Sequence, residues 1–253
     1  SNKKLTNLKI NKGKISKKGN LMNSGIYFFK KKILKQIPLR SFSLENDYLE
    51  DKILYNKINL LINKKKKFFI DIGTYKNYLS AKKNLKNKLI QPAIFFDRDG
   101  VINKLKPYVG NMKRFELNKN IFKTFKFLNK KEIFIFIVTN QAGIAKGYYT
   151  EKEYLRFEKK IKLLFYKNNL FINDVKYCPF HPKGTIKRYI KNSNYRKPGN
   201  FMIRDLLNEW PINLQKSIMI GDQITDEKSA KSINLKFQYV QKDIFLQIKS
   251  FFN

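Results

Sequence analysis

The sequence predicts an α/β fold in which residues 93–253 form a three-layer domain with a mostly parallel sheet and no large inserted cap. Three apolar runs have the length and composition of buried strands: AIFF at 93–96, IFIFIV at 133–138 and SIMI at 217–220. Polar residues directly follow each run, as at the carboxyl ends of parallel strands, where open α/β sheets bind their ligands.

Strands and helices are expected to alternate along this domain. We expect strands near 93–96, 133–139, 174–178, 217–220 and 237–240. Helices are expected near 121–129, 151–167, 201–209 and 226–232, where they would cover the faces of the sheet. The spacing leaves room only for loops between these elements, so we expect the substrate to be selected by loops such as 107–115.

Residues 1–85 are predicted to form a separate α/β segment, joined to the domain by a linker at 86–92. Residues 23–38 predict a strand and a short helix, and residues 43–58 predict a capped helix. Residues 66–85 predict a strand, a turn at Gly73 and another helix.

The formal charge of +35 over 253 residues would ordinarily indicate nucleic acid or an anionic membrane as a partner. The positive residues are mostly Lys scattered over the whole chain, whereas a surface that binds nucleic acid is expected to concentrate Arg. Asn, Ile and Phe are also abundant, so we interpret the charge mainly as coding bias. We expect no specific nucleic-acid partner, although the charge would attract a phosphorylated substrate.

Membrane and secretion signals are weak in this sequence. The apolar runs are far shorter than the ~20 residues of a membrane-spanning helix, and the first residues lack a signal-peptide core. One cysteine, Cys178, leaves no internal disulfide. We therefore expect a cytoplasmic enzyme with no membrane partner.

Four short motifs follow one another along the domain: FFDRDGVIN at 95–103, IVTNQAG at 137–143, RKP at 196–198 and IGDQITD at 220–226. Phosphoryl transfer requires an oxygen nucleophile, a hard divalent cation, a positive group on the phosphate and a proton donor for the leaving oxygen. Asp97 is predicted to be the nucleophile. Asp99 is predicted to protonate the leaving group and then to activate water.

The other motifs supply the remaining groups. Asp222 offers an oxygen to Mg²⁺, with Asp226 as a further candidate ligand, because Mg²⁺ prefers carboxylates, phosphate and water. Lys197 is predicted to neutralise the phosphate, and Thr139 and Asn140 to donate hydrogen bonds to its oxygens.

Each motif alone has an ordinary structural explanation. An Asp-x-Asp after a strand is most often a turn or a helix cap, and VTN is equally a strand that ends in a cap. In this chain, a Lys before Pro is by default a solvated loop residue. The occurrence of all four motifs at predicted strand ends favours catalysis over these explanations.

Residues 93–243 resemble the haloacid-dehalogenase superfamily of phosphatases, in particular the heptose bisphosphate and histidinol-phosphate phosphatases. The resemblance implies that Gln141 and Arg196 also bind substrate, and that Asp97, Asp99 and Asp222 hold Mg²⁺, Asp99 through its backbone carbonyl. It implies removal of the C7 phosphate of D-glycero-D-manno-heptose 1,7-bisphosphate through an aspartyl-phosphate intermediate.

The sequence departs from this family at one place. Many members carry a structural zinc in the loop before RKP, but here the loop reads YCPFHP and then NSNYRKP. Cys178 is retained, whereas Phe180, Ser193 and Tyr195 occupy ligand places. Because a closed zinc site needs four ligands and the chain has one Cys and one His, we expect no zinc. Cys178 and His181 are then predicted to be a buried small residue and a loop residue.

The first segment resembles the carboxyl-terminal part of sugar-phosphate nucleotidyltransferases, in which an N-x-GIY segment contacts the sugar and a DIGT segment binds metal. Asn23 and Asp71 are the matching residues. The Gly-rich loop that would hold the nucleotide is missing, so we expect a fragment of a longer bifunctional enzyme or a degenerate remnant, with the missing transferase half as a potential partner. A fusion of consecutive steps favours the heptose bisphosphate. Histidinol phosphate ranks second, and a basic nucleic-acid-binding or scaffold protein ranks third because it leaves the acidic motifs unexplained.

We predict that this chain makes no nucleotide sugar from heptose 1-phosphate and GTP, ATP or CTP, because transfer needs the nucleotide phosphates held by such a loop. Asp71→Ala should leave phosphatase turnover nearly unchanged. A pyrophosphate-release assay with each nucleotide checks the first statement, and detectable pyrophosphate would contradict it.

Overall fold

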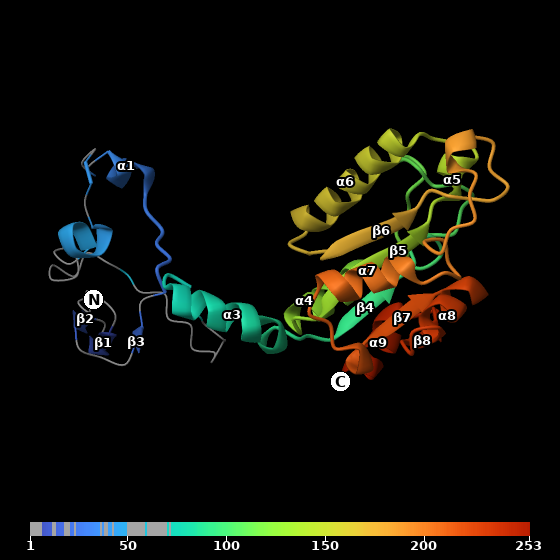
Figure 1. Ribbon diagram of the computed structural model, residues 1–253. Coiled ribbons are helices and arrows are strands. Elements are labelled where there is room, and N and C mark those ends of the chain that lie inside the picture. The colour runs from blue at the N-terminus through green and yellow to red at the C-terminus, as the bar shows by residue number, and fades with distance from the viewer. Residues whose placement is uncertain are drawn as a thin grey trace. The chain divides into compact units, whose positions relative to one another are not determined.

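The computed structural model describes residues 7–11, 14–17, 21–22, 24–35, 37, 40–41, 43–49, 59, 70 and 72–253 (Figure 1). The chain divides into two units, Ser1–Phe69 and Ile70–Asn253. The candidate residues of the phosphatase motifs all belong to the second unit. Asn23 and Asp71, which were assigned to a transferase site, lie outside the described residues.

The first unit contains a small antiparallel sheet in the order β2-β1-β3. Its strands are β1 Asn7–Asn11, β2 Lys14–Lys17 and β3 Leu21–Met22, and two short helical turns follow, α1 Lys31–Leu34 and the π-helical η1 Leu44–Leu49. The strand expected near the start of 23–38 is wrong for residues 24–30, which are neither strand nor helix. Ile26 and Phe28 are 69% and 84% exposed, so the apolar pattern there covers no sheet face among the described residues.

The second unit begins with the helix α3 Tyr75–Lys88. It follows a bend at Gly73 and Thr74, and the Thr74 hydroxyl accepts a hydrogen bond from the Asn77 amide at 3.2 Å. The turn and helix expected here are therefore present. The helix continues to Lys88, so the first residues of the predicted linker are helical.

Five parallel strands form the central sheet of the second unit, in the order β6-β5-β4-β7-β8 (Figure 1). They are β4 Ala93–Phe96, β5 Phe134–Asn140, β6 Asp174–Cys178, β7 Ile218–Gly221 and β8 Lys236–Tyr239. Each agrees with the expected range to within one residue at either end. The predicted α/β class with a mostly parallel sheet is confirmed.

Helices pack on both faces of this sheet, which gives the three predicted layers. The helices are α4 Ile121–Lys130, α5 Ala142–Ala145, α6 Glu151–Lys167, α7 Phe201–Glu209, α8 Ile224–Lys231 and α9 Ile244–Phe252, with 3₁₀ turns η2 Lys187–Tyr189 and η3 Leu214–Lys216. Among them, α5 and α9 were not expected from the sequence. No described helix is both long and apolar enough to cross a bilayer.

Alternate residues of the strands point to opposite faces of the sheet and belong to two separate apolar cores. Ile94 and Phe96 of β4 face a core that includes residues of α4, α6 and α9, whereas Ala93 and Phe95 face a core with residues of α7 and α8. All four side chains are fully buried, as expected for a central strand covered on both faces.

The strand order places a crevice at the centre of the sheet. From β4 the chain moves outward through β5 to β6, then returns to place β7 on the other side of β4. Ligands of open α/β sheets bind outside the carboxyl ends of the strands at such a switch point. Asp97 directly follows β4 and Asp222 directly follows β7, so the topology brings these two carboxylates together.

Candidate active site

The centre of the site is the ammonium group of Lys197. Its Nζ lies 2.7 Å from Asp97 Oδ1 and 2.6 Å from Asp226 Oδ1, and it donates a hydrogen bond to the Val138 carbonyl at 2.8 Å. The Lys197 side chain is only 1% exposed. The residue predicted to bind phosphate therefore also neutralises two buried carboxylates.

Asp97 lies where β4 ends beside β7, and its backbone amide donates to the Ile220 carbonyl at 2.9 Å. Burial raises the pKa of the Asp97 carboxyl to about 7; the Lys197 ammonium opposes this rise, and the charge of Asp226 adds to it. Burial disfavours the charged form of Lys197 too, but the two carboxylates outweigh it and raise the pKa of Lys197. The carboxylate pair thus keeps the lysine charged.

Asp226 organises the loop after β7. Its Oδ2 accepts hydrogen bonds from the backbone amides of Asp222 at 3.2 Å and Gln223 at 3.1 Å, while its Oδ1 contacts Lys197. Such a carboxylate in the first turn of α8 suits the positive end of the helix dipole. Both oxygens of Asp226 are therefore engaged within the protein.

One carboxylate oxygen of Asp222 is not used within the described part of the chain. The Gln223 side chain donates to its Oδ2 at 3.0 Å, but its buried Oδ1 has no hydrogen-bond partner among the described residues. Burial raises the pKa of Asp222. An unpartnered buried oxygen of this kind calls for a donor or a cation, since leaving it bare costs free energy.

The carboxylates of Asp97, Asp222 and Asp226 form a group that fits a divalent metal ion, with ligand oxygens within 4.8 Å of one another. The Lys197 ammonium contacts only Asp97 and Asp226, so a hard dication would complete the balance of charge. Two glycines permit the close packing: a Cβ on Gly100 would overlap the Asp222 carboxylate, and one on Gly221 would overlap Asp226. Asp97 and Asp222 fit the ion better than Asp226, whose oxygens are both engaged.

Asp99 has a separate set of partners. Its carboxylate accepts from Nη2 of Arg98 at 2.7 and 3.0 Å, from the Asn103 amide at 3.0 Å and from the Gln141 amide at 3.2 Å. Asp99 is therefore held beside the crevice by a cation other than the one that contacts Asp97. Arg98 and Asn103 were missed by the sequence reasoning, although both lie within the FFDRDGVIN motif.

The TNQ residues at the end of β5 hold neighbouring segments in place in this structure. The Asn140 side chain donates to the Lys197 carbonyl at 3.1 Å and accepts from the Lys197 amide at 3.0 Å, so its amide serves the lysine main chain rather than pointing freely at a ligand. Thr139 is buried, and its hydroxyl accepts from the Gln141 amide at 2.8 Å. These residues join the lysine loop and Asp99 to the same strand end.

Arg196 is directed towards the loop after β6. Its Nη1 donates to the Phe180 carbonyl at 3.5 Å, and burial lowers the pKa of its guanidinium. In the same loop, His181 Nδ1 accepts from the Lys183 amide at 3.0 Å. Arg196 thus precedes Lys197 in the chain, but its hydrogen bond to Phe180 lies outside the carboxylate group.

The loop positions that carry zinc ligands in many family members have other contacts here. Phe180 packs against Tyr189 with ring centroids 6.2 Å apart, and Lys191 Nζ lies 5.5 Å from the Phe180 ring. Cys178 and Tyr195 lie in the apolar core that faces α7. Aromatic packing therefore occupies this part of the loop.

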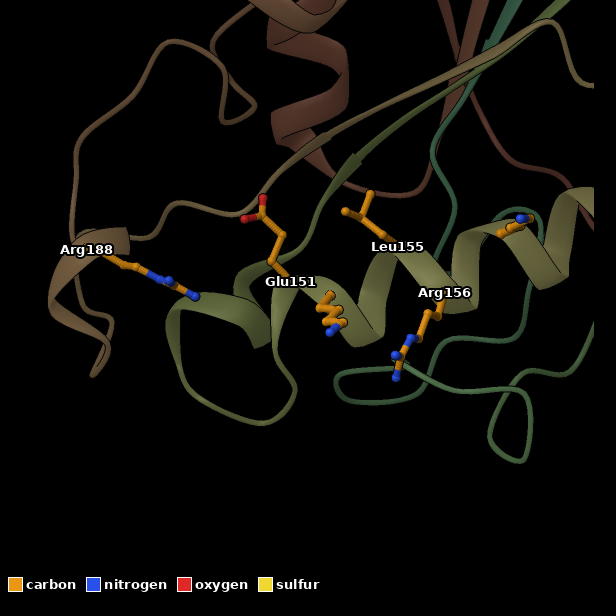
Figure 2. A pocket seen from close by; sticks show the side chains of 6 residues that line it. Glu151, Leu155, Arg156 and Arg188 are labelled. Carbon is orange, nitrogen blue, oxygen red and sulfur yellow. The ribbon is translucent and has the colours of Figure 1, made fainter.

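A shallow hollow of about 490 Å³ lies on the outer surface of α6 and η2, and Figure 2 shows Arg188 of η2 extending towards α6. It is lined by Glu151, Lys152, Leu155, Arg156, Lys159 and Arg188. The Glu151 oxygens accept from the hydroxyls of Tyr177 and Tyr189 at 2.8 Å each, so they are already paired. None of its lining residues belongs to the carboxylate group, which remains the candidate active site.

Comparison with known proteins shows the family to which the chain belongs. The family described as polynucleotide kinase 3 phosphatase matches residues 92–245, more than half of the chain. The chain belongs to this family. A D-glycero-beta-D-manno-heptose-1,7-bisphosphate 7-phosphatase from Rhodopseudomonas palustris is 35% identical over 160 residues, 63% of this chain and 89% of the relative. A D-glycero-alpha-D-manno-heptose-1,7-bisphosphate 7-phosphatase from Burkholderia mallei is 36% identical over 134 residues, 53% of this chain and 71% of the relative.

The solved structures agree on the fold. D,D-heptose 1,7-bisphosphate phosphatase from B. bronchiseptica, complexed with magnesium and phosphate, aligns with a TM-score of 0.54 at 20% identity, covering 63% of this chain and 86% of that chain. The predicted membership among haloacid-dehalogenase-type phosphatases and the predicted enzyme class, a phosphoric monoester hydrolase, are confirmed. The resemblance of the first segment to a nucleotidyltransferase stays a prediction.

We predict that Gly100→Ala weakens Mg²⁺ binding and lowers Mg²⁺-dependent phosphatase turnover, because the added methyl group would displace the Asp222 carboxylate. A loss on the order of tenfold or more is expected, as for a misplaced ligand. Titration of turnover against Mg²⁺ concentration measures it. Gly147→Ala is the matched control, since Gly147 also has positive φ, +74° against +90°, but its Cβ would meet no atom closer than 3.4 Å. Equal effects of the two variants would show that backbone strain, not the carboxylate, is responsible.

Proposed function

We propose that this protein is a Mg²⁺-dependent phosphatase that removes the C7 phosphate of D-glycero-D-manno-heptose 1,7-bisphosphate through an aspartyl-phosphate intermediate on Asp97. The observation that carries the proposal is the Lys197 ammonium between Asp97 and Asp226, beside the unpartnered oxygen of Asp222. The substrate is inferred from the names of the two relatives, which are 35% and 36% identical to this chain.

The first chemical step uses the two carboxylates of the DRD segment. An oxygen of Asp97 attacks the phosphorus, the bond from phosphorus to the sugar oxygen breaks, and Asp99 gives its proton to that oxygen. In the second step Asp99 takes a proton from water, whose oxygen attacks the phosphorus and returns Asp97 as a carboxylate. Phosphate and the dephosphorylated sugar are the products.

Lys197 and a bound Mg²⁺ would balance the negative charge of the carboxylates and the phosphoryl group. Lys197 neutralises Asp97 and is positioned to offset the charge on the transferred phosphoryl group, where a preorganised cation is most effective. Asp97 and Asp222 would hold Mg²⁺ with the Asp99 carbonyl, and the bound ion would supply charge stabilisation for the phosphoryl oxygens. Thr139, Asn140, Gln141 and Arg196 are proposed to bind substrate when it enters.

Three further statements from the sequence remain predictions. They are the cytoplasmic location, the absence of zinc, and a transferase half that would act together with this chain. Nucleotide-activated heptose synthesis would use the dephosphorylated 1-phosphate, which suits a neighbouring transferase segment.

A panel of substrates tests the proposed function. Phosphate release should be measured with Mg²⁺ on both anomers of the heptose 1,7-bisphosphate, on histidinol phosphate, on a 3′-phosphorylated oligonucleotide and on p-nitrophenyl phosphate. We expect the highest kcat/KM on one of the bisphosphate anomers. A higher value on histidinol phosphate would favour the second candidate, and a higher value on the oligonucleotide would overturn our interpretation of the charge.

We predict that Asp97→Asn abolishes turnover while the protein stays folded, because an amide cannot form the acyl phosphate. Loss of a covalent nucleophile costs on the order of 10⁴ or more in rate. Steady-state kinetics with Mg²⁺ and a circular dichroism spectrum check the two parts. Retention of more than a small fraction of the activity would show that Asp97 is not the nucleophile.

A further inference from the structure

Arg98, which lies between the two aspartates of the DRD segment, is buried at 2% exposure. One nitrogen, Nη2, makes its polar contacts: two with Asp99, one with the Val109 carbonyl at 2.6 Å and one with Gln141 Oε1 at 3.3 Å. Its Nε and Nη1 have no hydrogen-bond partner in the described part of the chain. The polar end of Arg98 is therefore aimed at Asp99 and its surroundings.

Two aromatic rings of α6 hold the guanidinium from the side of the core. Its central carbon lies 5.2 Å from the Phe157 ring centroid and 5.8 Å from that of Tyr154, within the range of cation–π attraction. Both rings are buried in the core that faces α4, α6 and α9. The two rings therefore pack close to the guanidinium and limit its movement.

Burying a charged guanidinium costs free energy unless an opposite charge pairs with it. Burial disfavours the charge, but Asp99 outweighs it and raises the pKa of Arg98. If packing were the only requirement, an apolar side chain of similar volume would fill the space between the rings at lower cost. The partner that justifies the charge is the Asp99 carboxylate, whose side chain is 22% exposed and faces the crevice side.

A second chain of hydrogen bonds reaches Asp99 from Tyr149 through Gln141. The Tyr149 hydroxyl donates to Gln141 Oε1 at 2.8 Å, and the Gln141 amide donates to Asp99 at 3.2 Å. A Cβ on either Gly110 or Gly143 would overlap the Tyr149 ring, so the glycines give that ring its place. Arg98 and the Tyr149–Gln141 pair therefore converge on the same carboxylate.

We propose that Arg98 is a positioning residue, which holds the Asp99 carboxyl at the orientation required for proton transfer to the leaving oxygen. The inference rests on the proposed function, in which Asp99 protonates the oxygen released when the bond to phosphorus breaks and later accepts a proton from water. Arg98 makes no bond in either step. The second step is common to all substrates, so the effect that depends on the leaving group is sought in kcat/KM, which reports the steps up to formation of the phosphorylated Asp97.

The test compares leaving groups. An alkyl phosphate, such as the heptose bisphosphate or glycerol phosphate, needs protonation of its leaving oxygen, whereas p-nitrophenolate departs without it. We expect Arg98→Met to lower kcat/KM on the alkyl phosphates about 10²-fold, the scale of general acid catalysis, and on p-nitrophenyl phosphate about threefold or less. Arg98→Lys should restore part of the loss on alkyl phosphates. Equal losses on both substrate types would overturn the proposal, because a merely structural role would affect them alike.

Two further variants separate this inference from the proposed function. Asp99→Asn should show the same selective loss, and the double variant with Arg98→Met should lose little more than Asp99→Asn alone. If Asp99→Asn lowers kcat/KM equally on both substrate types, the acid role itself fails. If only Arg98→Met does so, the role of Arg98 fails and the proposed function stands.

If Arg98→Met does not fold, Tyr149→Phe tests the proposal instead. The variant retains the ring between Gly110 and Gly143 but removes the hydroxyl that braces Gln141. We expect a smaller loss of about three- to tenfold on alkyl phosphates and no loss on p-nitrophenyl phosphate. Equal losses on both would count against an Asp99 held by this network.

Discussion

The site depends on one interaction, the buried ammonium of Lys197 shared by Asp97 and Asp226. It joins three parts of the chain that are far apart in sequence: the end of β4, the RKP loop and the first turn of α8. Without the ammonium, two carboxylates would face each other in a buried crevice, and one of them would have to be protonated. Because the lysine offsets only part of the negative charge, the same arrangement both stabilises the fold and leaves a demand for a dication.

The two aspartates of the DRD segment are two residues apart but have different cations. Asp97 contacts Lys197, which lies 100 residues later in the chain, whereas Asp99 contacts Arg98 of its own segment. Because the partners are separate, the two carboxylates are held independently of each other, and each can take its own role in the proposed reaction.

Much of the fold could be predicted because its signals are local. The sequence pattern predicted the five strands to within a residue, three of them from apolar runs, and the acidic motifs indicated which side chains meet at the switch point. The choice of partners could not be predicted in the same way. That the Asn140 amide binds the Lys197 main chain, or that Arg196 turns towards Phe180, depends on packing between distant segments. The strand predicted around Ile26 and Phe28 was wrong for the same reason, because an apolar strand pattern forms a strand only where a sheet is available to pair with it.

The paired hydrogen bonds between Asn140 and the main chain of Lys197 bear on which parts of this domain can accept changes in sequence. They fasten the lysine to a core strand just after the variable loop, and Ser229 of α8 fastens the next residues through the Gly199 carbonyl at 2.9 Å. The loop from 179 to 195 therefore lies between the end of β6 and a segment fastened by its own contacts, and its own sequence need not place the ammonium. Such a loop is free to exchange metal ligands for aromatic residues, or to alter its length, while the carboxylates beneath it keep their geometry.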